Sequence, residues 1–290
     1  MYAQQLDWRE CGPEFDYREG LEGYIVEQGG RVEGLRCTTI AVPLDWDDPQ
    51  NEQTIELSAL HIPATGDAPI GTLLSNPGGP GVSGTEFALG LTGAESFAAV
   101  HEEYDLLGFD PRGISRSAPV ECESDTEIFE LQLALCADEN PLAQSMGSAQ
   151  VARDMELMRH LIGDETMNYA GFSYGTVIGA SYATLFPERV GRIMLDSAWP
   201  SDWSSPLGSY LQYEANAHAM NDLVVGCADE YEVSLCPMRG EESLLQTLER
   251  LDEQPLVATD GTGVDGGMLR GYLTTALYSL SAGRHQVLDV

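Results

Sequence analysis

The order of the predicted elements favours an α/β fold, a mostly parallel sheet with helices on both faces. Two observations support this class. Short apolar stretches alternate with segments of helical periodicity, and polar, glycine-rich motifs follow the ends of those stretches. Hydrophobic residues make up 43% of the 290-residue chain, which is enough for a proper core. After residue 199 the sequence pattern changes and predicts helices without strong buried strands.

Residues 1–36 are polar and glycine-rich and specify their structure poorly. The stretch CTTIAVPLDW, 37–46, predicts a strand that ends at a proline turn. The stretch TIELSALHIP, 54–63, alternates apolar and polar residues in places and predicts an antiparallel partner for it.

The following segments predict strands and helices in alternation. Strands are expected at 71–75 and 104–109, each before a loop. Apolar residues recur at helical spacing from Ser148 onward, at Val151, Met155, Met158 and Ile162. Beyond this helix we expect a strand at 167–173, a helix at 174–186 ending before Pro187, and a strand at 192–198.

Two regions are expected. Residues 1–199 would form the N-terminal part of the sheet domain, and residues 200–290 the start of a helical cap, with candidate helices at 243–256 and 268–280. The C-terminal part of the sheet domain is expected to lie beyond residue 290, so that the sequence is truncated.

The net charge limits the kinds of partner that the protein is expected to bind. There are 47 acidic and 14 basic residues, all of the latter Arg, for a net charge of −33. Such a surface repels nucleic acid and anionic lipid. Salt adaptation in a GC-rich lineage is the favoured explanation, and a surface that attracts cationic ligands is the alternative.

No apolar run approaches the ~18 residues of a membrane span, and MYAQQLDWRE lacks the features of a signal peptide.

The cysteines predict disulfides and an exported, secreted or cell-envelope protein. None lies in a CxxC pair, so we expect no zinc or thioredoxin-type site. They form three sequence-local pairs, each of which could stabilise the fold by roughly 2–4 kcal/mol. Buried free thiols in a cytosolic protein are one alternative, and other pairings of the six cysteines are another. The six residues are Cys11, Cys37, Cys122, Cys136, Cys227 and Cys236.

The segment Gly171-Phe172-Ser173-Tyr174-Gly175 fits the G-x-S-x-G nucleophile elbow. A serine on a tight strand-to-helix turn needs small residues two positions away, because strand and helix pack closely there. The helix N-terminus then favours developing negative charge at the serine. The alternative is a helix-capping serine in a structural or nucleotide-binding turn. Ser173 is the candidate catalytic nucleophile.

The loop NPGGPG, Asn76 to Gly81, is placed to complete an oxyanion hole. One donor is expected from the backbone N–H of Tyr174 and the second from Gly79, with Gly78 next in preference. An ordinary Gly/Pro turn is the alternative. In GFDPRG, Asp110 and Arg112 are expected to form a local pair that braces the loop rather than to act in catalysis.

Together these stretches resemble the α/β-hydrolase exopeptidases of the prolyl aminopeptidase and secreted tripeptidyl aminopeptidase group. The similarity extends from about residue 35 to 285 and lies in CTTIAVPLDWDDP, SNPGGPGVSG, LLGFDPRGISRSAPVEC, the elbow segment and CADEYEVSLCP. It implies an α/β-hydrolase fold with a helical cap, a serine peptidase that acts on free peptide N-termini, export and disulfides. We expect no cofactor or metal. Ser115 stands where the family usually has a second glycine, which would stiffen or shift that loop.

The resemblance implies a triad in the order Ser, Asp, His, and its last two members are not identifiable. Asp196 follows the strand after the elbow but is usually structural in this family. The five histidines, none in a Gly-His loop after a terminal strand, are His61, His101, His160, His218 and His285. We expect His160 at the surface and the triad Asp and His beyond residue 290. An esterase or lipase-like hydrolase on small acyl substrates, or a non-catalytic binding protein, are the alternatives to a peptidase.

Overall fold

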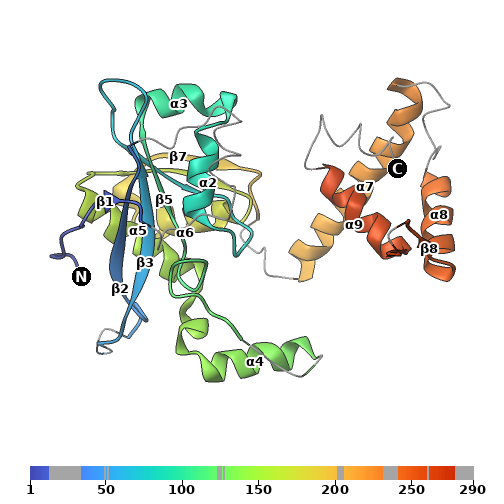
Figure 1. Ribbon diagram of the computed structural model, residues 1–290, viewed down its shortest axis with the longest axis horizontal. Coiled ribbons are helices and arrows are strands. Elements are labelled where there is room, and N and C mark those ends of the chain that lie inside the picture. Colours follow the sequence, from blue (N-terminus) through green and yellow to red (C-terminus); the bar gives the residue numbers. More distant parts are fainter. Residues whose placement is uncertain are drawn as a thin grey trace. The chain divides into compact units, whose positions relative to one another are not determined.

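The computed structural model describes residues 1–12, 34–48, 50, 52–122, 126, 128–200, 206–230, 241–259 and 261–277 (Figure 1). The chain divides into two compact units, Met1–Ser201 and Asp202–Val290. Each unit is described by itself.

A seven-stranded sheet forms the centre of the first unit, in the order β1-β2-β3-β5-β4-β6-β7. Strands β1 (Arg9–Glu10), β2 (Arg36–Pro43) and β3 (Thr54–Ile62) pair antiparallel, and β3 also pairs antiparallel with β5. The other pairings are parallel, among β4 (Thr72–Asn76), β5 (Asp105–Phe109), β6 (Met167–Phe172) and β7 (Val190–Asp196). The mostly parallel sheet and its antiparallel β2–β3 hairpin are confirmed.

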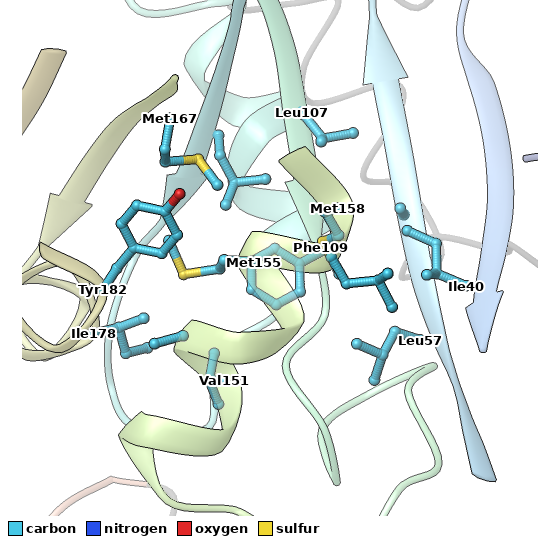
Figure 2. Close-up of a cluster of buried hydrophobic side chains, with 14 of the residues drawn as sticks. Ile40, Leu57, Leu107, Phe109, Val151, Met155, Met158, Met167, Ile178 and Tyr182 are labelled. Atoms are coloured by element: carbon cyan, nitrogen blue, oxygen red, sulfur yellow. The ribbon is translucent and has the colours of Figure 1, made fainter. Parts of the chain in front are cut away.

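Side chains of the sheet alternate between two apolar cores, because successive residues of a strand point to opposite faces. Leu107 packs in one cluster with α5 (Ser148–Ile162) and α6 (Gly175–Leu185), as Figure 2 shows. Its neighbour Leu106 packs in a second cluster with α2 (Gly84–Leu91) and residues at α3 (Ala98–Glu103). Helices therefore cover both faces, as predicted.

Helices α2, α3 and α4 (Phe129–Glu139) have no counterpart among the segments predicted from the sequence. Short 3₁₀ segments also occur, before α3, after α4 and after α6. The start of α2 has a clear local cause, since the Ser83 side chain accepts a hydrogen bond from the Glu86 amide and caps the helix. The 3₁₀ segments are η2 (Glu95–Phe97), η3 (Pro141–Ser145) and η4 (Pro187–Arg189).

A buried acid joins α5 to α6. Arg159 donates to both carboxylate oxygens of Glu156, and the Tyr182 hydroxyl donates to Glu156 Oε2 at 2.7 Å. Burial acts to raise the pKa of Glu156, but the hydrogen bonds from Arg159 and Tyr182, together with the charges of Arg159 and Arg189, outweigh it and lower that pKa.

The prediction that Asp110 and Arg112 pair with each other is wrong, because each side chain has other partners. Arg112 forms an ion pair with Asp154 of α5, with 2.6 Å between Nη2 and Oδ1 and neither side chain exposed. Asp110 is equally buried and accepts hydrogen bonds from Ser83 and Thr85. Both residues do brace loops. Arg112 does so through a partner far away in the sequence, and Asp110 through Ser83 and Thr85 together with its near neighbour Arg116, whose Nη1 lies 3.5 Å from Asp110 Oδ2.

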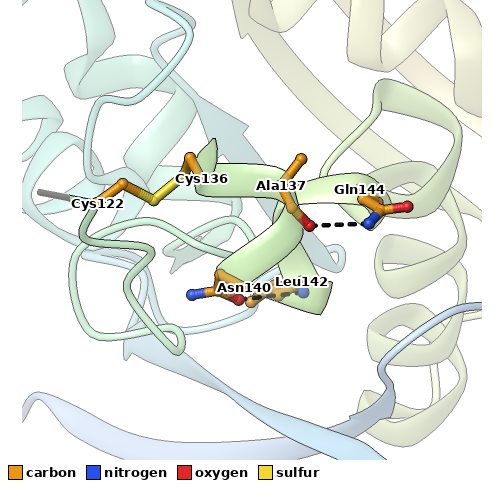
Figure 3. The surroundings of a disulfide bond; sticks show 6 residues. All are labelled: Cys122, Cys136, Ala137, Asn140, Leu142 and Gln144. Atoms are coloured by element: carbon orange, nitrogen blue, oxygen red, sulfur yellow. Dashed lines mark hydrogen bonds between the residues drawn. A yellow bond between two sulfur atoms is a disulfide. The ribbon is translucent and has the colours of Figure 1, made fainter. Parts of the chain in front are cut away.

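Two disulfides form within the described residues, Cys11–Cys37 and Cys122–Cys136. The second links the loop before α4 to the helix itself (Figure 3). The third predicted pair is Cys227 with Cys236. Cys236 and the side chain of Cys227 lie outside the described residues.

The second unit contains α7 (Pro206–Glu230), α8 (Glu241–Glu253), α9 (Gly266–Leu277) and the short antiparallel pair β8 (Leu256–Val257) and β9 (Gly263–Val264). Helices α8 and α9 overlap the two candidate helices predicted from the sequence. Among the helices that the structure describes, none combines the length and the apolar character that crossing a bilayer requires. A small apolar cluster holds the unit together: Val224, Leu244, Leu248 and Leu273.

Candidate active site

Ser173 lies on the tight turn between β6 and α6 and has a left-handed backbone, with φ of 51°. A residue with a side chain adopts this region rarely and at an energetic cost, so the surrounding structure must hold it there. The Ser173 amide donates to the Asp196 carbonyl at the end of β7, with 3.0 Å between nitrogen and oxygen. The turn is thus fixed by the neighbouring strand, and the geometry is that of a nucleophile elbow.

The two glycines that flank the serine are required by close packing. A Cβ on Gly171 would lie 2.5 Å from the Gly175 carbonyl oxygen and 2.6 Å from the Tyr169 ring. A Cβ on Gly175 would lie 2.5 Å from the Asn76 carbonyl oxygen. Strand β6, helix α6 and the end of β4 therefore meet at contact distance, which is the reason for the G-x-S-x-G spacing.

Hydrogen bonds hold the first turn of α6 in place. The Thr176 hydroxyl donates to the Ser173 carbonyl at 2.6 Å and accepts from the Trp199 amide at 3.0 Å. The Tyr169 hydroxyl donates to the Gly175 carbonyl at 2.7 Å, and its burial, with a smaller contribution from Tyr174, raises the pKa of Tyr169 well above its usual value. The helix N-terminus consequently points at Ser173 with a defined orientation.

The NPGGPG loop packs directly against the elbow. Gly78, Gly79 and Gly81 all have positive φ, of 91°, 105° and 101°. A Cβ on Gly78 would lie 2.6 Å from the Tyr174 amide nitrogen. The structure therefore brings the two sequence-predicted parts of the oxyanion hole, Tyr174 and the glycine loop, side by side.

Of the two glycine donors considered, Gly78 already has an acceptor. Its amide donates to Asn76 Oδ1 at 2.9 Å, and Asn76 is a buried residue, 1% exposed. This geometry favours Gly79 as the second oxyanion donor, as the sequence predicted, and the assignment stays a prediction.

The far end of the loop is held by Asp110, which follows β5. Asp110 Oδ1 accepts from Ser83 Oγ at 2.6 Å and from Thr85 Oγ1 at 2.9 Å, and Oδ2 accepts from the Arg116 amide at 3.2 Å. In the loop after β5, Ser115 has φ of 50°, a conformation that glycine adopts without strain. Ser115, which stands where the family usually has a glycine, therefore has the left-handed backbone that favours glycine.

The sequence-based search missed Asn76, Ser83 and Thr176 as supports of the site. A signal existed for Ser83, because Ser83 and Glu86 form the S-x-x-E pattern of a helix N-terminus. Asn76 also has a local signal, because its bond to the Gly78 amide spans only two residues and is an Asx turn. The bond of Thr176 to the Ser173 carbonyl spans three residues, and only its contact with the Trp199 amide depends on a residue distant in sequence.

The other candidate triad residues lie as follows. The Asp196 side chain is exposed and accepts from the Ser197 hydroxyl, while its carbonyl supports the elbow. His61 contacts Asp105 at 3.1 Å, and His101 contacts the Pro63 carbonyl at 3.1 Å.

Of the remaining histidines, His160 is exposed, as expected, and its ring packs edge-on against Tyr2. His218 belongs to α7 of the second unit, and His285 lies outside the described residues. In the part of the chain that the structure describes, no group of three or more His, Cys, Asp or Glu side chains is arranged to hold a metal ion.

Comparison with known proteins identifies the family. Residues 71–216 match the family described as alpha/beta hydrolase fold, and the chain belongs to that family. It is 35% identical over 254 residues to serine protease Hip1 of Mycobacterium tuberculosis, an alignment that covers 78% of this chain and 47% of that protein. It is 30% identical over 240 residues to tripeptidyl aminopeptidase of Streptomyces lividans, which covers 73% and 40%.

A third relative carries an esterase name. Carboxylesterase B of Mycobacterium tuberculosis is 31% identical over 290 residues, which covers 91% of this chain and 53% of that protein. The chain thus spans about half the length of the curated relatives it matches. The α/β-hydrolase fold and the resemblance to serine hydrolases with peptidase members are confirmed at the level of the family.

Proposed function

We propose that this chain carries the nucleophile and oxyanion hole of an exported serine aminopeptidase of the prolyl or tripeptidyl type. The observation that carries the proposal is the left-handed Ser173, whose following amide, that of Tyr174, lies against the glycine loop after β4. A serine in this geometry exposes its hydroxyl beside two backbone donors, which is the arrangement that acyl transfer requires.

In the proposed reaction, Ser173 Oγ attacks the carbonyl carbon of the scissile amide and its proton passes to a general base. The Tyr174 and Gly79 N–H groups hold the carbonyl oxygen as it becomes an oxyanion. The same base returns the proton to the leaving nitrogen, the C–N bond breaks, and an acyl-enzyme remains on Ser173. Water then cleaves the acyl-enzyme by the same steps.

Two findings support the peptide substrate and the export. The relatives include proteins named serine protease and tripeptidyl aminopeptidase. The disulfides Cys11–Cys37 and Cys122–Cys136 suit an oxidising compartment. Residues 200–290 would serve as a cap whose carboxylates bind the ammonium group of the substrate. A second candidate is an ester hydrolase, which the relative named carboxylesterase B favours.

The test uses a fluorophosphonate probe together with aminoacyl-anilide, tripeptidyl-anilide and short acyl ester substrates. The 290-residue chain and the protein expressed from the gene's full reading frame are compared, each with a Ser173→Ala variant. Ser197→Ala is the matched control, because Ser197 is also left-handed, with φ of 56°, and lies next to Asp196.

Probe labelling and anilide cleavage that are lost in Ser173→Ala and kept in Ser197→Ala would support the aminopeptidase. Ester cleavage without anilide cleavage would favour the esterase. If neither protein is labelled or active, the hydrolase proposal fails and a binding role becomes the better explanation.

A further inference from the structure

Asn76 occupies the junction between the glycine loop and the elbow. It is the last residue of β4 and pairs in register with Gly171, the first glycine of the elbow motif. Its side chain is buried, with 1% of the residue exposed. In the sequence it is only the first letter of NPGGPG, and the proposed function gives it no role.

The contacts of Asn76 reach both halves of the proposed oxyanion hole. Its Oδ1 accepts the Gly78 N–H at 2.9 Å. The same oxygen lies 3.1 Å from the position that a Cβ on Gly175 would take, at the start of α6. Gly78 in turn packs against the Tyr174 amide. The carboxamide is therefore enclosed by the loop on one side and by the nucleophile turn on the other.

The buried Nδ2 group of Asn76 indicates that this residue does more than stabilise the fold. Within the described residues, Asn76 Nδ2 is buried and has no hydrogen-bond partner. A buried donor without a partner destabilises the folded state, and an apolar side chain of similar volume, such as Leu, would avoid this. What Leu could not supply is the acceptor for Gly78.

We propose that Asn76 is a positioning residue for the oxyanion hole. By binding the Gly78 N–H it withdraws that donor and fixes the turn, so that the next amide, that of Gly79, is directed with the Tyr174 amide toward one substrate oxygen. This inference rests on the proposed function. Because the charge on that oxygen develops only in the transition state, loss of the positioning lowers kcat much more than it changes KM.

Two variants of the full-reading-frame protein test the inference. Asn76→Leu keeps the volume and removes the acceptor. We expect kcat on the best substrate and the fluorophosphonate labelling rate each to fall ~10- to 100-fold, with KM changed less than about threefold. Asn76→Asp keeps an acceptor but introduces a carboxyl group beside the hole. We expect its activity to decline as pH rises and that group ionises, because a negative charge opposes the oxyanion.

Asn168→Leu is the matched control. Asn168 is a buried asparagine of β6 whose Oδ1 accepts from the Arg192 amide and whose Nδ2 donates to the Thr72 carbonyl, at the end of the sheet away from the elbow. Its replacement is expected to lower the thermal midpoint and leave kcat and KM unchanged. Thermal midpoints are measured at each pH, so that loss of fold is separated from loss of rate.

The outcomes separate the two proposals. If the wild-type protein is neither labelled nor active, the proposed function fails. If the wild type is active and Asn76→Leu is folded with a wild-type kcat, the positioning role is overturned and the function stands. If Asn76→Leu does not fold, Asn76→Asp decides, and a pH profile identical to that of the wild type overturns the inference.

Discussion

Removal of the Asp154 carboxylate is the sharpest test of how the first unit is held together. Arg112 donates to Asp154 through Nε at 2.8 Å and Nη2 at 2.6 Å, and its remaining donors reach the carbonyls of Leu44, Ser145 and Pro43. Trp46 Nε1 also donates to Asp154, at 2.7 Å. Neither charged side chain is exposed. In Asp154→Ala the guanidinium stays buried with carbonyl partners only.

The expected loss follows from that geometry. Removing one partner of a fully buried ion pair destabilises a protein by about 3–5 kcal/mol, since the other charge is left without compensation. For a unit of this size, each kcal/mol shifts the thermal midpoint by roughly 2–4 °C. The midpoint of Asp154→Ala should therefore fall by roughly 6–20 °C, as measured by circular dichroism and by urea unfolding.

Two further variants decide whether the charge is the cause. Arg112→Met combined with Asp154→Leu removes both charges and should recover most of the loss. Arg36→Ala breaks the solvent-exposed pair with Glu10 and should leave the midpoint nearly unchanged. If Asp154→Ala shifts the midpoint no more than Arg36→Ala does, the buried pair is not what joins α5 to the loops of the sheet.

Three other predictions concern strain, pH and salt. Ser115→Gly should raise the free energy of unfolding by about 0.5–1 kcal/mol, because glycine adopts φ of 50° without strain, and a lower urea midpoint would contradict this. Glu156 has a lowered pKa in the folded state, so its stabilisation is present above its unfolded pKa and is lost as pH falls through the folded value. Urea unfolding between about pH 5 and 3 should accordingly show a shallower loss of stability in Glu156→Gln than in the wild type, and equal slopes would refute the assignment. Molar KCl should raise the thermal midpoint, since it screens the repulsion that a net charge of −33 produces, and a midpoint that falls steadily with salt would count against salt adaptation.

The elements predicted correctly are those whose signal is local. The strands β4 and β6 are short apolar runs before loops, and the elbow is a motif of five adjacent residues. Helix α5 showed its apolar face through Val151, Met155 and Met158, all of which are buried in the first core. In each case the neighbours that matter lie within a few positions in the sequence.

The features that were missed depend on distant partners. Closeness in sequence predicts Asp110 as the partner of Arg112, whereas Asp154 on α5 supplies the carboxylate. Among the described side chains of helix α4, Leu131 and Leu135 are exposed, as is Ile128 at its N-cap, so these residues form no buried stripe. The packing of Gly78 against Tyr174 requires the pairing of β4 with β6, which no stretch of either strand encodes alone.

Because of that pairing, the geometry of the proposed site depends on the register between β4 and β6. Asn76 lies opposite Gly171, and the glycine contacts allow no Cβ between the loop and the turn. A slip of one residue between β4 and β6 would turn every side chain of the slipped strand to the other face and separate Gly78 from Tyr174. The two proposed oxyanion donors can meet only after this long-range parallel contact has formed, a slow kind of step in folding. During refolding, reactivity at Ser173 should therefore appear after helical structure, together with the native sheet.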